Sequence, residues 1–161
     1  MSTLALPNYR TPRALALLVG FLVLVIGVGG VIGVANVPGS WYQGLQKPFF
    51  NPPNWVFAPA WFTLYVLIGI AGWRTFLDKP VSGRMALWVG QMALNWMWSP
   101  VWFGLHALWP ALAIIVSILV LILAFIATSW RRDAVSAWLF VPYALWVGYA
   151  STLNLSIALL N

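Results

Sequence analysis

Long runs of apolar residues constrain this chain more than any other feature. Residues 14–34 carry no charge, and further apolar runs cover about 54–72, 85–104, 111–129 and 137–160. A helix of about 20 apolar residues crosses a bilayer, whereas a membrane β-barrel requires short segments of alternating polarity. The first run is longer than a signal peptide's apolar region, and no convincing cleavage site follows it. We therefore predict an all-α integral membrane protein, a single domain (1–161) folded as a bundle of five transmembrane helices.

The few charged residues predict the orientation. Lysine and arginine number eight in 161 residues, and aspartate and glutamate together number two. Five crossings place seven of the eight basic residues on one side and only Lys47 on the other. Basic loops stay on the cytoplasmic side of a membrane. We expect a multi-pass protein with a cytoplasmic amino terminus, in a bacterial membrane, and we interpret the net charge of +6 as topology and not as nucleic-acid binding.

The segment 35–53, after the first run, is rich in proline and aromatic residues. Its Lys-Pro and Pro-Pro steps favour extended or turned backbone and exclude helix. One interpretation is a lid over a cavity that opens to the non-cytoplasmic side, and the other is a segment lying among lipid headgroups. The predicted lid residues are Trp41, Lys47, Pro48, Pro52 and Pro53.

The sequence is poor in groups for acid–base or metal chemistry. It has no cysteine or glutamate, and its acids, Asp78 and Asp133, fall beside basic residues in predicted loops. We interpret both as solvated loop charges, and the single histidine, His106, as a turn residue. We therefore expect no metal site, no cofactor and no conventional catalytic residue. The absence of charge within the predicted spans also argues against an ion-coupled pump.

Aromatic and amide side chains recur at helical spacing in three of the runs. Neighbours three or four residues apart share one helix face. These faces carry Phe57, Trp61, Tyr65 and Gly69 in the second run, Gln91, Asn95 and Ser99 in the third, and Tyr143, Trp146, Ala150 and Leu153 in the fifth. They either surround a cavity for a large, flat, mostly apolar ligand or pack directly against one another. The first and fourth runs are interpreted as packing elements, and Pro142 is expected to perturb the fifth.

Three ordered motifs then resemble a known family. They are Trp41-Tyr42-Gln43-Gly44-Leu45-Gln46-Lys47-Pro48 followed by Pro52-Pro53-Asn54-Trp55-Val56-Phe57-Ala58-Pro59-Ala60-Trp61, then Asn95-Trp96-Met97-Trp98-Ser99-Pro100, then Leu139-Phe140-Val141-Pro142-Tyr143-Ala144-Leu145-Trp146. Together they resemble the TspO/MBR family, the tryptophan-rich sensory proteins that include the mitochondrial translocator protein. The resemblance extends from about residue 15 to residue 155.

The resemblance implies a receptor or sensor of porphyrins such as protoporphyrin IX and haem, acting in tetrapyrrole regulation or stress signalling. Alternatives are a passive carrier of porphyrin or sterol, and a light- and oxygen-dependent porphyrin-degrading enzyme that uses Trp61 and Trp146. Carried over by motif, Trp61 and Asn95 would hydrogen-bond the ligand. The ligand-binding residues implied are Tyr42, Phe57, Trp61, Tyr65, Asn95, Trp98, Trp146, Ala150 and Leu153.

Two further implications concern sterols and partners. The sterol-recognition pattern of animal members requires a basic residue shortly after Tyr143, and here no basic residue follows Arg132. The family also implies a homodimer formed through the third span. Ala86 with Gly90, and Gly29 with Gly33, are small-residue pairs that either join two copies or pack within one bundle.

Overall fold

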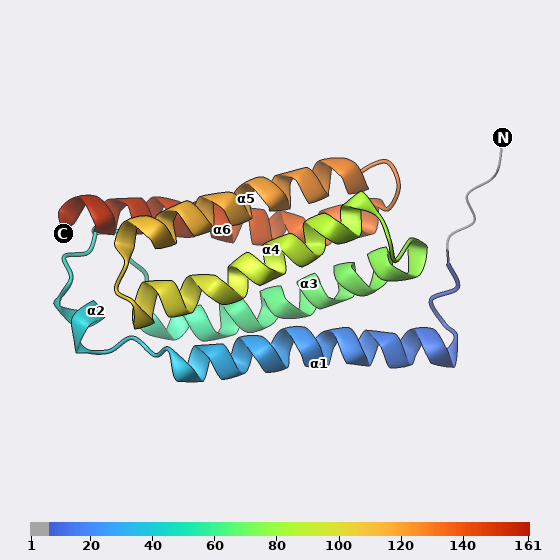
Figure 1. Ribbon diagram of the computed structural model, residues 1–161, viewed down its shortest axis with the longest axis horizontal. Coiled ribbons are helices and arrows are strands. Elements are labelled where there is room, and N and C mark those ends of the chain that lie inside the picture. Colours follow the sequence, from blue (N-terminus) through green and yellow to red (C-terminus); the bar gives the residue numbers. More distant parts are fainter. Residues whose placement is uncertain (1–6) are drawn as a thin grey trace.

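The computed structural model describes residues 7–161, which form a bundle of long helices (Figure 1). The long helices are α1 (Pro12–Ala35), α3 (Phe57–Asp78), α4 (Gly83–Ser99), α5 (Leu108–Ser129) and α6 (Ala134–Leu160). Shorter elements are α2 (Ser40–Gly44), the 3₁₀ turn η1 (Asn54–Val56) and the π-helix η2 (Pro100–Gly104), which continues α4. The all-helical fold expected from the apolar runs is thus confirmed for the described residues.

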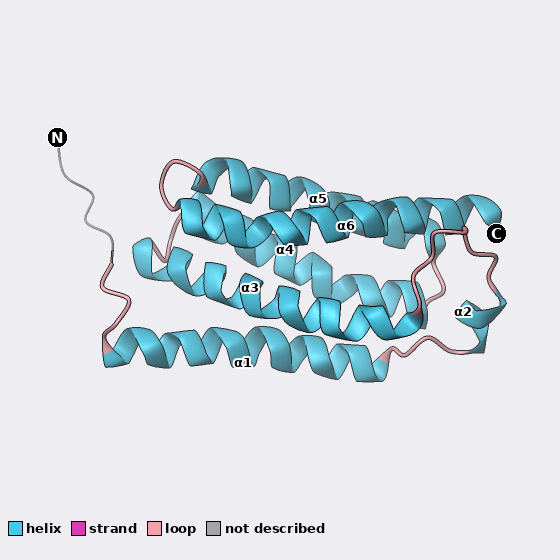
Figure 2. Ribbon diagram, turned by 180° about the vertical axis from the view of Figure 1, so that it is seen from behind, coloured by secondary structure: helices cyan, strands magenta, loops and turns pink. Residues whose placement is uncertain are grey.

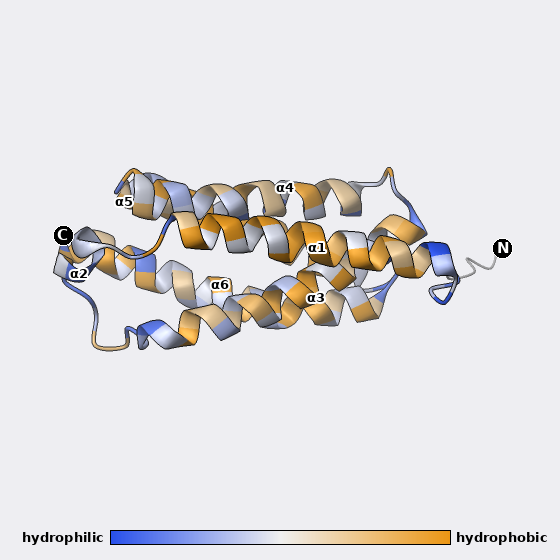
Figure 3. Ribbon diagram, turned by 90° about the horizontal axis from the view of Figure 1, so that it is seen from below, coloured by the Kyte–Doolittle hydropathy of each residue, from blue (hydrophilic) through white to orange (hydrophobic). Residues whose placement is uncertain are grey.

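Four of these helices are long and apolar enough to cross a membrane, namely α1, α3 with η1, α5 and α6. The fifth, α4, has 17 residues and is therefore about 25 Å long, slightly less than the thickness of a bilayer's hydrocarbon core. Many large apolar side chains of the helices are exposed, among them Val23 of α1 and Val120 of α5, and Figure 3 shows apolar residues along the length of α1. The protein is therefore an integral, multi-pass membrane protein.

Capping residues explain where several helices begin. The Thr11 hydroxyl accepts from the Ala14 N–H at the start of α1, and Pro12 occupies the first turn, where its missing N–H costs nothing. The Ser82 hydroxyl likewise accepts from the Met85 N–H at the start of α4. The largest difference between a predicted and an observed helix boundary is at the end of α3. The apolar run is predicted to end at about residue 72, whereas α3 continues to Asp78 and therefore contains Arg74.

The helices are packed unequally. Helix α5 packs against both α4 and α6, whereas α1 packs mainly against α3, with a smaller contact to α4. Figure 2 shows α1 at the edge of the bundle. The core lies among α3, α4, α5 and α6 and includes Ile68, Ile122, Phe125 and Phe140, which are all fully buried. Helix α1 contacts the bundle mainly through α3, and another part of its surface lines the cavity between the helices.

Helix α6 continues past Pro142, so the perturbation expected there does not end the helix. Proline removes one backbone hydrogen bond from a helix interior. The neighbouring residues Phe140 and Tyr143 are both fully buried in the core, and this packing holds the helix together on either side of the missing bond.

The interpretation of the two acids as solvated charges is wrong. Asp133 accepts from the Arg74 guanidinium at 2.8 and 3.0 Å and from the Ser136 hydroxyl at 2.6 Å. Asp78 is paired with Arg84 and with Arg132. Burial raises the pKa of Asp133, but the hydrogen bonds from Arg74 and Ser136 outweigh it, so that the pKa lies below its usual value. Each carboxylate joins helices at the end of the bundle opposite the lid.

The segment predicted to exclude helix contains α2, a single helical turn between its prolines. Ring stacking and hydrogen bonds attach this segment to the bundle. The Trp41 ring stacks on His106, with 4.2 Å between ring centroids, and the Tyr149 hydroxyl donates to the Phe50 carbonyl at 2.6 Å. The backbone N–H and carbonyl of Gln46 form two hydrogen bonds of 3.0 Å with the side-chain amide of Asn161. The segment is therefore fixed across one end of the bundle.

Candidate ligand cavity

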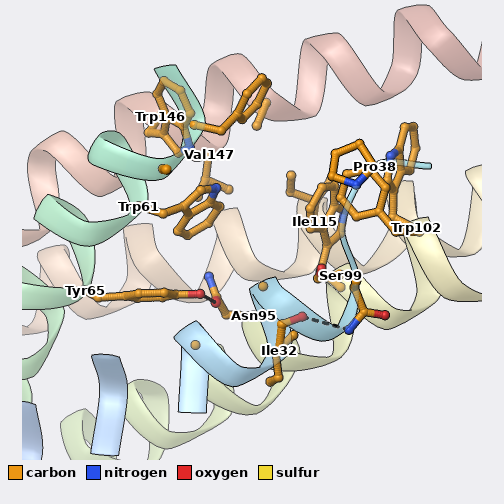
Figure 4. A pocket seen from close by; sticks show the side chains of 18 of the residues that line it. Ile32, Pro38, Trp61, Tyr65, Asn95, Ser99, Trp102, Ile115, Trp146 and Val147 are labelled. Carbon is orange, nitrogen blue, oxygen red and sulfur yellow. Dashed lines mark hydrogen bonds between the residues drawn. The ribbon is translucent and has the colours of Figure 1, made fainter. Parts of the chain in front are cut away.

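A cavity of about 590 Å³ lies beneath the segment 35–53, between α1, α3, α4, α5 and α6 (Figure 4). All nine residues predicted to bind a ligand line it: Tyr42, Phe57, Trp61, Tyr65, Asn95, Trp98, Trp146, Ala150 and Leu153. No charged side chain is among the described residues that line it. Of the two interpretations of the aromatic faces, the structure therefore supports a cavity over direct packing. Ligand binding by these residues stays a prediction.

One wall of the cavity is formed by indole rings from α3 and α6. Trp61 and Tyr65 of α3 lie 5.4 Å apart by ring centroids, and Phe57 lies edge-on to Trp146 of α6 at 5.9 Å. Within residues 7–161, the indole N–H of Trp146 is buried and has no hydrogen-bond partner. A buried donor without a partner is costly unless a ligand or water accepts its proton. The wall therefore contains an N–H donor that lies buried within its apolar surface.

Beside Tyr65, Asn95 of α4 takes part in hydrogen bonds to two other helices. Its side-chain oxygen accepts from the Tyr65 hydroxyl at 3.2 Å, a contact drawn in Figure 4. Its side-chain nitrogen donates to the Tyr143 hydroxyl of α6 at 2.8 Å. Each half of the amide therefore already has a partner, and a ligand would meet only the remaining N–H and the remaining lone pair.

The π-helix η2 shapes the other end of the cavity. The ring of Trp102 stacks on that of Trp98, with centroids 5.8 Å apart, and Phe103 lies edge-on to Trp98 at 5.9 Å. A π-turn takes more residues than an α-turn, which brings the consecutive Trp102 and Phe103 onto the Trp98 ring together. The Trp98 indole donates to the Asn154 side chain at 3.2 Å. At this end the Trp98 indole N–H therefore already has a protein partner.

Residues of the predicted lid are divided between two roles. Tyr42 is buried and lines the cavity, as does Pro38. Trp41 packs outside it on Trp102 and His106, and the Lys47 ammonium lies over the Tyr42 ring at 4.6 Å. Pro48, Pro52 and Pro53 do not line the cavity. The segment covers the cavity mainly through Tyr42, while the other residues hold it in place.

The first and fourth runs pack within the bundle, as interpreted, but they also line the cavity. Helix α1 lines the cavity with Gly29, Gly30 and Gly33, and α5 lines it with Ile115 and Ile118. The glycine spacing in α1 was the available signal, because glycines recurring on one helix face leave space beside that face. Isoleucines in a uniformly apolar helix offered no comparable signal.

The small-residue pairs proposed for dimer contact are partly used within the bundle. A Cβ atom at Gly29 would lie 2.3 Å from the Tyr65 ring, and one at Gly90 would lie 3.5 Å from Leu121 of α5. Both glycines therefore face neighbouring helices of the same chain. A dimer formed through α4 stays a prediction.

The composition of the cavity wall limits the chemistry available there. Its polar groups are indole N–H groups, phenols, amides and the Ser99 hydroxyl, and the wall has no carboxylate, imidazole or ammonium group to transfer protons. Aromatic walls of this kind suit a flat, mostly apolar molecule with hydrogen-bond acceptors at its edge.

The chain is similar to several known proteins. The TspO/MBR family profile matches residues 16–160. The chain is 39% identical to protein CrtK of Rhodobacter capsulatus over 82% of this chain and 85% of that protein. It is 36% identical to a tryptophan-rich sensory protein of Cereibacter sphaeroides and 37% identical to the pig (Sus scrofa) translocator protein, each over 84% of this chain and 85% of the relative.

Proposed function

The chain belongs to the TspO/MBR family, and on that premise we propose that it is a membrane receptor or sensor that binds a porphyrin in the cavity beneath the first loop. The names of its relatives, a sensory protein and a translocator protein, support a role in sensing or transport. The observation that carries the proposal is an uncharged cavity of about 590 Å³ lined by Trp61, Trp98, Trp102 and Trp146.

A porphyrin fits the chemistry of this cavity. Its macrocycle is flat and apolar, so that it would lie against the indole rings of Trp61 and Trp146. Its carboxylates are acceptors for N–H donors, and the Trp146 indole has a buried donor without a protein partner. We propose that Trp61 and Asn95 donate to the ligand as well, and that Tyr42 covers it.

We also propose that the chain crosses the membrane five times. Helix α4 is short by itself, but η2 continues it without a break, so that the two together cover residues 83–104. Five crossings place Arg10, Arg13, Lys79 and Arg131 on the same side, which by the positive-inside rule is cytoplasmic. The lid and the cavity mouth then face the non-cytoplasmic side.

Quenching of tryptophan fluorescence by protoporphyrin IX in detergent tests the proposed binding. Loss of one ligand hydrogen bond costs about 1 kcal/mol, which corresponds to roughly fivefold in affinity. Trp61→Phe and Asn95→Ala are each expected to weaken binding by about that factor. The matched control is Trp138→Phe, since Trp138 is 60% exposed on the outer surface. Affinities unchanged in both cavity variants would refute the proposed site.

A further inference from the structure

A chain of hydrogen bonds extends from the cavity wall into the core, where it reaches Gln91, a residue that does not line the cavity. From the wall inward, Tyr65 donates to Asn95 at 3.2 Å, Asn95 donates to Tyr143 at 2.8 Å, and Tyr143 donates to the Gln91 side-chain oxygen at 3.0 Å. The Gln91 side-chain nitrogen then donates to the Trp88 backbone carbonyl at 2.9 Å. Gln91 and Tyr143 are fully buried, whereas Asn95 and Tyr65 line the cavity.

The last link of this chain determines the direction of every other link. The Trp88 carbonyl only accepts, so the Gln91 nitrogen must face it and the Gln91 oxygen must face Tyr143. The single proton of the Tyr143 hydroxyl then goes to Gln91, which leaves that oxygen to accept from Asn95. Asn95 must therefore turn its nitrogen toward Tyr143 and its oxygen toward Tyr65. A flipped Asn95 amide would leave Gln91 without its donor.

We propose that Gln91 is a positioning residue that sets the orientation of the Asn95 amide, through Tyr143, and so decides which hydrogen-bonding groups the wall presents to a ligand. The Tyr65 hydroxyl uses its only hydrogen in the bond to Asn95. The Tyr65 oxygen can therefore only accept a hydrogen bond from a ligand, whereas Asn95 can donate its second side-chain N–H. The inference rests on the proposed ligand cavity and deepens it, because it names the residue that controls the polarity of that wall.

The substitution Gln91→Met tests the proposal, since methionine has a similar length and no hydrogen-bonding group of comparable strength. Without the Gln91 acceptor, the Tyr143 hydroxyl can rotate and donate to Asn95 instead. Both orientations of the Asn95 side-chain amide then become available. We expect the affinity for protoporphyrin IX, measured by fluorescence quenching, to fall by about fivefold. The matched control is Met92→Leu, because Met92 is equally buried, adjacent in α4 and absent from the cavity wall.

Two further variants separate positioning from simple packing. At pH 5, a neutral carboxyl in Gln91→Glu would donate to Trp88 and accept from Tyr143 in the original directions, and we expect it to restore binding to within twofold of wild type. In a double-mutant cycle, Gln91→Met combined with Tyr143→Phe should bind no more weakly than Tyr143→Phe alone, because Gln91 acts through that hydroxyl.

The possible outcomes distinguish the inference from the proposed function. A wild-type chain that does not bind protoporphyrin IX refutes the proposed ligand. If wild type binds and Gln91→Met binds equally well, the positioning role is wrong while the cavity stands. Additive losses in the double variant, or no recovery of binding in folded Gln91→Glu, would also overturn it, since both would show that Gln91 acts by packing alone.

Discussion

The contact between Gly29 of α1 and the Tyr65 ring of α3 provides a test of the cavity wall. A Cβ atom at Gly29 would lie 2.3 Å from Tyr65 Cε2 and 2.6 Å from Cζ. Carbon atoms pack at about 3.5–4.0 Å, so Gly29→Ala requires the ring to retreat by roughly 1.2 Å or more. The cavity offers space for that movement, but the hydroxyl at the end of the ring is bonded to Asn95.

The expected magnitudes follow from this geometry. The bond between the Tyr65 hydroxyl and Asn95 is 3.2 Å long, and a displacement of about 1 Å breaks it. Overpacking costs about 1–3 kcal/mol, while replacing a helical glycine by alanine returns about 1 kcal/mol. We therefore expect a net destabilisation of about 1 kcal/mol. Ligand affinity should fall about five- to tenfold, because the wall loses a hydrogen bond and the ring occupies ligand space.

Thermal unfolding and protoporphyrin IX quenching, both in detergent, measure the two effects separately. Gly33→Ala is the matched control, since Gly33 lies one turn further along α1, also lines the cavity and has no atom within 4 Å of a Cβ position. That variant should keep wild-type affinity and equal or exceed wild-type stability. Equal affinities for the Gly29 and Gly33 variants would refute the assigned contact between α1 and Tyr65.

Two more predictions concern the remainder of the bundle. In Gly72→Ala the new Cβ would lie 2.3 Å from the buried Trp88 ring, whose N–H donates to the Ile68 carbonyl at 3.0 Å. We expect a loss of about 3 kcal/mol in unfolding free energy. Gly148→Ala, where nothing lies within 4 Å of the new Cβ, should instead gain up to about 1 kcal/mol, and equal melting temperatures of the two variants would contradict the prediction. The pKa of Asp133 is lowered in the folded chain by Arg74 and Ser136 against the effect of burial. Its stabilisation is therefore complete above about pH 5 and is lost as the pH falls below about 4. Asp133→Asn should lower stability by about 2 kcal/mol at neutral pH and weaken this acid dependence, and a melting curve with wild-type pH dependence would show that the pair with Arg74 contributes nothing.

Much of the site was accessible from the sequence because the spacing of its residues is set by helix geometry. Trp61 and Tyr65, or Trp146 and Ala150, are four residues apart and must share a helix face whatever surrounds them. Motif resemblance added Tyr42 and Trp98, and all of these residues line the cavity. The participation of α1 was missed, although the glycines on one of its faces were a signal, because glycines at such spacing also serve direct packing between helices.

The sequence by itself determined the class of protein. Apolar runs of about 20 residues leave a chain no alternative to helices in a membrane, since backbone groups in hydrocarbon must be satisfied locally. Only the tertiary structure decided which polar groups became partners. The pairing of Asp133 with Arg74, 59 positions away, and the path from Tyr65 through Asn95 and Tyr143 to Gln91 depend on the relative rotation of whole helices. Helix rotation is determined by side-chain packing across the bundle, and no local pattern in a single helix encodes it.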